Sequence, residues 1–281
     1  MTATLAASRL GLLGDGFIYA APALDSRVCR HSVTLACALT DTPLTVTVAD
    51  RQWRGRLLAV RPFVARHMAS AGQPAVVIDL EPQYPHYSAF SRPAGAEPAL
   101  TLDDQRFTGL LACADAFARQ ALSGRQLQAA LQLQVGDLAD SLGHRKSPDP
   151  RVLQMMAALR LDAGLSLATL AQPVGLSATR ASRCFVETLG LTVRQFALSV
   201  KIQRAASFYG SGRPLTEVAL IAGFTDSAHL ARVWRRCYDG SPSHFFAAHR
   251  SVADGRVEHA WRQQVRWGGP AQRATAALGS R

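Results

Sequence analysis

The sequence predicts an α+β protein in which a β-barrel or sandwich with a helical hairpin precedes an all-α domain. Short apolar or alternating runs separated by Pro, Gly and Asp fill residues 28–80, which is typical of antiparallel β structure. From about residue 103 the apolar residues recur at helical spacing instead, and the chain stays mainly helical to about residue 250. A chain of 281 residues is long enough for roughly two domains.

The β domain is expected over residues 1–102. Its strands are predicted at 33–39, 44–48, 57–60 and 75–80, where apolar residues are continuous or alternate with polar ones. A proline-rich stretch at 81–98 then interrupts the pattern.

A helical hairpin is predicted over residues 103–143, where Gly124 separates two apolar stripes. The hairpin either joins two copies of the chain or covers the open side of the β domain, and the pattern favours neither. Residues 144–150 have the composition of an interdomain linker, and the basic tail 251–281 is expected to be poorly ordered. The stripes consist of Phe107, Leu110, Leu111, Ala114, Phe117 and Ala121, and of Leu127, Leu131, Val135, Leu138 and Leu142.

Charge and cysteine content narrow the class of protein. The net charge is +11, of which residues 1–148 contribute +2, residues 149–250 contribute +6 and residues 251–281 contribute +3. The excess lies in the C-terminal half, where a polyanion is the expected partner. The five cysteines are scattered and odd in number, which argues against a disulfide framework or zinc site and fits a reducing cytoplasm. No apolar run approaches the roughly 20 residues of a membrane helix.

An internal repeat in the C-terminal half indicates two helix-turn-helix motifs within residues 151–250. Residues 167–176 recur as 215–224, and the match resumes beyond one inserted residue. Gly175 and Gly223 supply the positive φ that ends a first helix. Ser177 and Asp226 then cap a second helix, which in such motifs enters the major groove. A connecting helix over 192–209 would span roughly 27 Å and present both second helices to successive grooves.

The outward faces of the two second helices supply the predicted DNA contacts. Arg183 and Arg232 occupy equivalent positions in the repeat and are the best candidates for guanine, although a phosphate contact is the alternative for each. The predicted base contacts are Thr179, Ser182, Arg183, Ser227, Ala228 and Arg232, and the predicted phosphate contacts are Arg180, Arg194, Lys201, Arg204, His229 and Arg235.

Residues 150–250 closely resemble the DNA-binding domain of the AraC/XylS family of bacterial transcription regulators, most strongly at 215–236 and 240–245. The resemblance implies a cytoplasmic regulator, an activator that works with RNA polymerase and double-stranded DNA. The N-terminal half resembles the family's cupin-like sensor region less specifically, which implies a small-molecule effector or a homodimer. Ala181 and Cys184 are smaller than the family's usual Leu, Val193 replaces a common Pro, and Ala228 cannot hydrogen-bond a base.

Two other functions are weighed against an effector-controlled regulator. The first is a regulator without a ligand, controlled by its abundance or by a protein partner. The second is a cupin-type enzyme fused to a DNA-binding unit, and no nucleophile motif or phosphate loop supports it. His31 and His67 are isolated, so we interpret them as structural. We therefore expect no enzyme activity, no metal and no cofactor.

Overall fold

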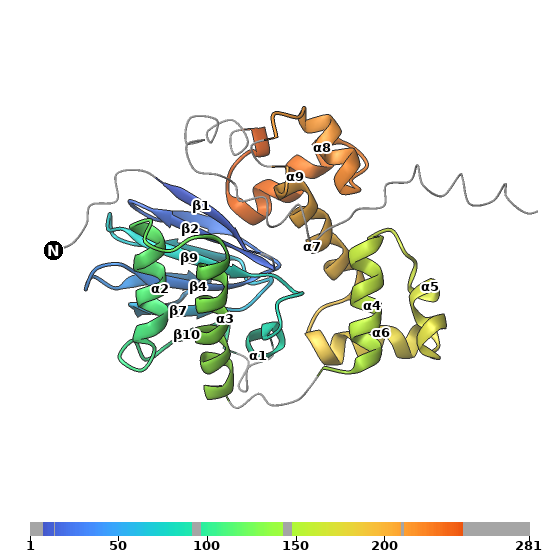
Figure 1. Ribbon diagram of the computed structural model, residues 1–281, viewed down its shortest axis with the longest axis horizontal. Coiled ribbons are helices and arrows are strands. Elements are labelled where there is room, and N and C mark those ends of the chain that lie inside the picture. Colours follow the sequence, from blue (N-terminus) through green and yellow to red (C-terminus); the bar gives the residue numbers. More distant parts are fainter. Residues whose placement is uncertain (1–7, 14, 92–96, 143–147, 209–210, 244–281) are drawn as a thin grey trace, which may run out of the picture.

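The computed structural model describes residues 8–13, 15–91, 97–142, 148–208 and 211–243, and it confirms the α+β class (Figure 1). Its N-terminal half contains two antiparallel sheets. The six-stranded sheet has the order β1 (Arg9–Leu13), β2 (Gly16–Ala21), β9 (Ala75–Leu80), β4 (Val33–Ala38), β7 (Leu57–Val60) and β10 (Ala99–Thr101). The four-stranded sheet has the order β3 (Asp25–Val28), β8 (Arg66–Ala69), β5 (Leu44–Val48) and β6 (Arg51–Gly55).

Both faces of the six-stranded sheet are covered. Along β4, Ala36 and Ala38 pack with Val46 and Met68 of the four-stranded sheet. Leu35, on the opposite face of the strand, packs with the core beneath the helical hairpin. Because successive side chains of a strand point to opposite faces, a strand covered on both sides is apolar throughout. All six residues of β4 are buried, as this requires.

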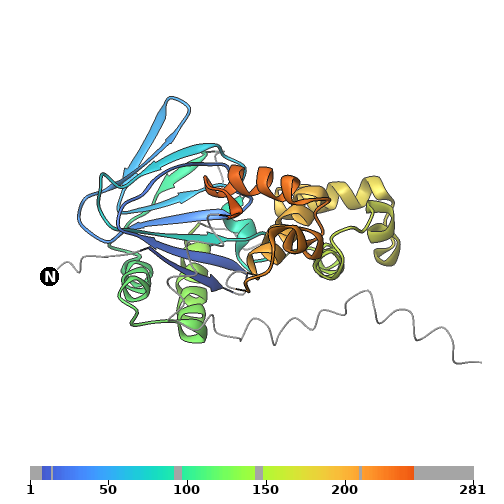
Figure 2. The same cartoon turned by 90° about the horizontal axis from the view of Figure 1, so that it is seen from above.

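The predicted hairpin is formed by α2 (Thr108–Ala118) and α3 (Gly124–Ser141), which lie side by side on the six-stranded sheet (Figures 1 and 2). Leu110 and Phe117 of α2 and Val135 of α3 are at most 2% exposed in the core that they share with the sheet. The apolar stripes therefore cover the β domain, which was one of the two interpretations. A role of the hairpin in pairing two chains stays a prediction.

The C-terminal half contains six α-helices among the residues that the structure describes. The connecting helix begins directly after Thr192, which caps it, but ends at Ala206, so it spans roughly 21 Å instead of the predicted 27 Å. Beyond it, Phe208 donates to the carbonyl of Ala205 in a turn, not a continued helix. The helices are α4 (Pro150–Leu161), α5 (Leu167–Ala171), α6 (Ala178–Leu189), α7 (Val193–Ala206), α8 (Leu215–Ala222) and α9 (Ser227–Tyr238).

Two short helical segments complete the fold. The helix α1 (Tyr87–Ser91) falls in the proline-rich stretch, and the 3-10 turn η1 (Gln172–Val174) follows α5. Within the described ranges, no helix combines the length and apolarity needed to cross a membrane. The predicted linker lies largely outside the described residues, as do the basic tail and positions 244–250 of the helical domain.

Candidate nucleic-acid interface

The first helix-turn-helix consists of α5, η1 and α6. Gly175 has a φ of +66° in the turn, as predicted. The hydroxyl of Ser177 accepts a hydrogen bond from the N–H of Arg180 at 3.3 Å and caps α6. Pro173 has no N–H to donate, and the first helix tightens into the 3-10 turn at this point. The buried Ala181 and Phe185 hold α6 against the domain core.

The second helix-turn-helix consists of α8 and α9. Gly223 has a φ of +90°, and Phe224 is buried beneath the turn. The carboxylate of Asp226 accepts the N–H of His229 at 2.6 Å, and this hydrogen bond lowers the pKa of Asp226. Trp234 is 1% exposed at the centre of the motif. The duplication seen in the sequence therefore produces two locally equivalent motifs.

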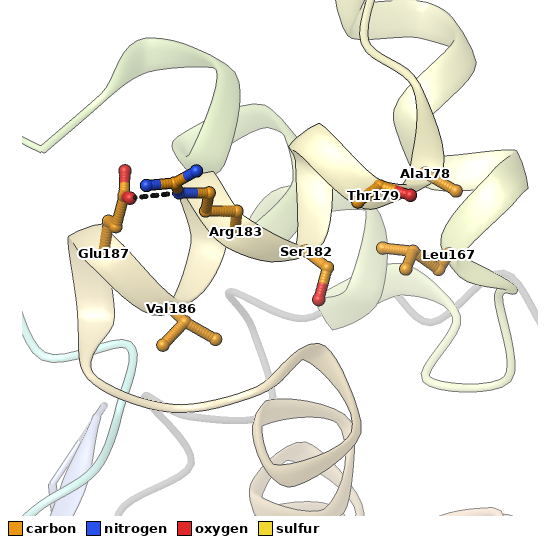
Figure 3. Close-up of a pocket in the computed structure, with 7 residues that line it drawn as sticks. All are labelled: Leu167, Ala178, Thr179, Ser182, Arg183, Val186 and Glu187. Carbon is orange, nitrogen blue, oxygen red and sulfur yellow. Dashed lines mark hydrogen bonds and ion pairs between the residues drawn. The ribbon is translucent and has the colours of Figure 1, made fainter.

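The outer face of α6 forms a shallow surface hollow of about 730 Å³ (Figure 3). Thr179 and Arg183 are exposed on this face and Ser182 is half-buried. Arg183 points along the helix to Glu187, and its Nε lies 2.8 Å from Glu187 Oε1. Glu187 was not among the residues predicted from the sequence, although a carboxylate four residues after an arginine is a recognisable signal.

The outer face of α9 carries the second set of predicted base contacts. Ala228 and Arg232 are exposed, and Ser227 is half-buried. Arg232 has no carboxylate within salt-bridge distance among the described residues, whereas Arg183 has Glu187. The two equivalent arginines therefore differ in their electrostatic surroundings.

The predicted phosphate contacts divide into two groups. Arg180, Arg194 and Arg235 are exposed. Arg204 differs from these three, because its Nη2 donates to the carbonyls of Arg160 at 2.8 Å and Leu161 at 3.0 Å. These carbonyls belong to the last turn of α4, which lacks helical partners for them. Burial also lowers the pKa of Arg204. We therefore assign Arg204 to the packing of α7 against α4.

Two further members of the predicted phosphate set have contacts within the second motif. The Nδ1 of His229 lies 3.1 Å from Thr225 Oγ1, and its ring meets that of Phe224 edge-on at 5.2 Å. The aliphatic part of Lys201 lies over Gly223. Both side chains are half-buried, so each packs against the turn of the second motif and is still partly exposed to solvent.

The last turn of α9 is docked on the β domain. The N–H of Cys29 donates to the carbonyl of Arg236 at 3.0 Å, and Arg30 Nε donates to the carbonyl of Cys237 at 3.0 Å. The last carbonyls of a helix have no intrahelical partner, so the β domain satisfies α9 there. The guanidinium of Arg30 also lies 5.4 Å from the centre of the Tyr238 ring. Sequence patterns within either domain give no signal for these contacts.

Arg30 joins this docking site to a buried polar cluster inside the β domain. It forms a salt bridge with Asp79, which accepts hydrogen bonds from Ser32 at 3.0 Å and Thr34 at 2.6 Å. Arg66 donates to Thr34 in the same cluster. A change in this part of the β domain would therefore reach α9 through one side chain.

The first motif contacts the β domain at different points. Ser91 of α1 donates through its hydroxyl to the carbonyl of Leu189 at 2.9 Å, at the end of α6. Arg160 of α4 forms a salt bridge with Asp15 at 3.3 Å. In the described ranges no group of three metal-ligating side chains is positioned to hold a metal ion.

Comparison with known proteins gives one family match, to a helix-turn-helix domain over residues 170–248. The chain is 33% identical over 87 residues to the arabinose operon regulatory protein of Escherichia coli and to that of Salmonella typhimurium. Residues 170–248 are therefore similar to a helix-turn-helix domain. These alignments cover 31% of the chain, and 30% and 31% of the two relatives.

Solved structures extend the likeness to both domains of this chain. ToxT from Vibrio cholerae O395 matches with a TM-score of 0.53 at 10% identity, over 85% of this chain and 96% of ToxT. A ToxT structure bound to (E)-4-(8-methylnaphthalen-1-yl)but-3-enoic acid matches with a TM-score of 0.54, at 10% identity over 85% of this chain and 98% of ToxT. At this identity the match describes the fold, in which a β domain precedes two helix-turn-helix motifs.

Proposed function

We propose that this chain is a sequence-specific DNA-binding transcription regulator. The observation that carries the proposal is the duplicated motif, which presents an exposed arginine at the same position of each second helix. The alignments with the arabinose regulators cover less than a third of those proteins, so the function of the whole chain is our inference.

The two exposed faces suit different kinds of base contact. Arg183 and Arg232 would each donate two hydrogen bonds to a guanine, which contributes roughly 1–3 kcal/mol of discrimination. The hydroxyls of Thr179, Ser182 and Ser227 can donate to or accept from base edges. The methyl group of Ala228 can contact only an apolar group such as the thymine methyl.

The exposed Arg180, Arg194 and Arg235, with the partly covered Lys201, would contact phosphates and make the affinity depend on salt. The core of α6 contacts α7 near its beginning, where the rings of Phe185 and Phe196 are 5.6 Å apart. The core around α8 and α9 contacts α7 near its end. We infer that both second helices contact successive major grooves of one duplex. Since one turn of DNA rises roughly 34 Å, this contact requires α6 and α9 to meet the duplex about one turn apart.

We further propose that the β domain binds a small effector and transmits its presence through Arg30. This is supported by a polar cluster in which the buried Asp79, Thr34 and Arg66 surround the half-buried Arg30, and Arg30 is the member that contacts α9. Structures of ToxT contain an unsaturated fatty acid or a synthetic acid. A metabolite that raises the thermal midpoint by several degrees would support an effector. No shift from any metabolite would favour a regulator controlled by abundance or by a protein partner.

Activation through RNA polymerase, and pairing of two chains, complete the proposal drawn from the family. Transcription in a purified system with the selected site placed upstream of a promoter tests the first. Sedimentation of the full chain tests whether two chains pair. The apolar stripes of the hairpin are buried within one chain, so pairing would have to use another surface.

The deciding experiment selects binding sites from random duplexes with the full chain and then measures affinities for a selected and an unrelated duplex. Arg183→Ala should lower the affinity for the selected site by roughly 5–150-fold, the equivalent of 1–3 kcal/mol. It should lower the affinity for the unrelated duplex far less. Arg213→Ala is the matched control, because Arg213 also pairs with a glutamate four residues later but lies outside α6 and α9. Equal losses on both duplexes would make Arg183 a phosphate contact. Failure to select any site would refute the function.

A further inference from the structure

Two cysteines from different domains meet where α9 docks on the β domain. Cys29 directly follows β3, and Cys237 lies in the last turn of α9. The N–H of Cys29 donates at 3.0 Å to the carbonyl of Arg236, the residue before Cys237. Backbone dimensions then place the two Cα atoms within about 7 Å of each other. Disulfide-bonded cysteines have Cα separations of roughly 4.4–6.8 Å, so the separation suits a bond.

The two thiols have complementary surroundings. Cys29 is half-buried, so a small solute can reach it, and its Sγ lies 3.9 Å from Nη2 of Arg236. Oxidants react with cysteine in its thiolate form, and access from solvent decides which thiols they meet. Cys237 is 1% exposed, and its Sγ lies 3.4 Å from Nδ1 of His31. The first thiol is therefore placed to meet an oxidant, and the second is placed to resolve the product.

We propose that Cys29 and Cys237 are an oxidation site, at which a peroxide converts the two thiols into a disulfide that joins α9 to the β domain. This assignment does not depend on DNA binding, because it rests on the contact between the two domains.

The reaction balances with hydrogen peroxide as the oxidant. The Cys29 thiolate attacks one peroxide oxygen, the O–O bond breaks, and the product is a sulfenic acid with release of water. Cys237 Sγ then attacks Cys29 Sγ, so that an S–S bond forms and the S–O bond breaks. The leaving hydroxide takes the thiol proton of Cys237 and becomes a second water. In total, two thiols lose two electrons and one peroxide becomes two waters.

The protonation states show which form of the resolving pair is present near pH 7. Burial raises the pKa of Cys237 to about 12, so this residue remains a thiol until it reacts. Burial, together with the charge of Arg236, lowers the pKa of His31 to about 4, so the imidazole is neutral and its contact with the thiol orients Cys237 without removing its proton. Two hydrogen bonds to backbone carbonyls at the end of α9, from Arg30 Nε and from the N–H of Cys29, already hold α9 against the β domain.

Mass spectrometry of the full chain tests the assignment directly, because trypsin places each cysteine in its own peptide. The expected product after one equivalent of hydrogen peroxide joins peptide 28–30 to peptide 237–250, and dithiothreitol should reverse it. Cys184→Ser is the matched control, since Cys184 is another half-buried thiol, bonded to Asp149 at 3.2 Å, and this variant should form the same product. The other three cysteine peptides are 31–51, 107–119 and 184–194.

Cys29→Ser removes the reactive thiol at a half-buried position, so it should fold normally and lose the cross-linked peptide completely. Cys237→Ala should fold less well, but in its folded fraction Cys29 should proceed to the sulfinic acid for want of a resolving thiol. The assignment is overturned if Cys29 in the unaltered chain ends as sulfinic acid while Cys237 stays open to alkylation. It is also overturned if Cys29 pairs with another cysteine, or if it remains reduced while Cys184 oxidises.

Discussion

Replacing Arg30 by methionine should destabilise the protein by about 3 kcal/mol, because a buried carboxylate loses its cation. The side chains of Arg30 and Asp79 are 11% and 5% exposed in their salt bridge. Without Arg30, Asp79 retains hydrogen bonds from Ser32 and Thr34. Breaking a buried pair costs roughly 3–5 kcal/mol. We expect the lower end of that range, since the nearby charge of Arg66 also acts on Asp79.

Urea unfolding at pH 7, followed by circular dichroism, measures this loss. Arg27→Met is the matched control, because the contact of Arg27 with Asp239 uses its backbone N–H and survives the change. That control should stay within roughly 0.5 kcal/mol of the unaltered chain. The double variant Arg30→Met/Asp79→Asn should lose at least about 1 kcal/mol less than the sum of its single changes. A loss below about 1 kcal/mol for Arg30→Met, or strict additivity in the cycle, would refute the account of the cluster.

Three further changes test other parts of the structure. His31→Gln should flatten the stability profile between pH 6.5 and 4. The folded-state pKa of His31 is lowered to about 4, so its contribution of up to about 3 kcal/mol to the free energy of unfolding is complete above pH 6.5 and is lost on acidification. Unfolding midpoints of the variant and the unaltered chain that differ equally at pH 7.5 and at pH 4.5 would contradict this. Arg204→Met should cost about 1–3 kcal/mol in thermal unfolding, because two carbonyls of α4 lose their donor, and its affinity for unrelated DNA should change less than that of Arg235→Met. Glu187→Gln frees Arg183 and removes a negative charge from the α6 face, so binding to unrelated DNA should strengthen several-fold at low salt and less at high salt, and an unchanged affinity would place this face away from the duplex.

Four of the ten strands in the described residues, β4, β5, β7 and β9, could be predicted from the sequence, and three of them share a physical cause. The predicted strands β4, β7 and β9 are central in their sheet, so burial on both faces makes them apolar throughout. The missed β6 is largely exposed at an edge, and β10 has three residues and depends on β7 for its pairing. A short or exposed strand has little hydrophobic pattern in its sequence, because its position is fixed by hydrogen bonds to a neighbouring strand.

The helix-turn-helix motifs were predictable because their determinants are local. Gly175 and Ser177 act within a few residues of the turn that they shape, so sequence spacing is enough to identify them. The end of α7 and the contacts of Arg204 depend instead on the position of α4, which lies more than forty residues earlier in the chain. The docking of α9 depends on the loop after β3, more than two hundred residues away. These contacts could be found only in three dimensions.

The two copies of the repeat have the same local structure but different surroundings, and this separates their roles in the proposed function. The first copy presents two hydroxyl side chains and Arg183 on an open face. It contacts the β domain at the end of α6, away from that face, through Leu189. The second presents Ala228, which cannot hydrogen-bond a base, and the last turn of α9 is bonded to the β domain. A helix held at one end by another domain responds when that domain changes. Under the proposed function, discrimination between sequences should therefore rest mainly on α6, and α9 should be the helix through which the β domain alters contact with the second groove.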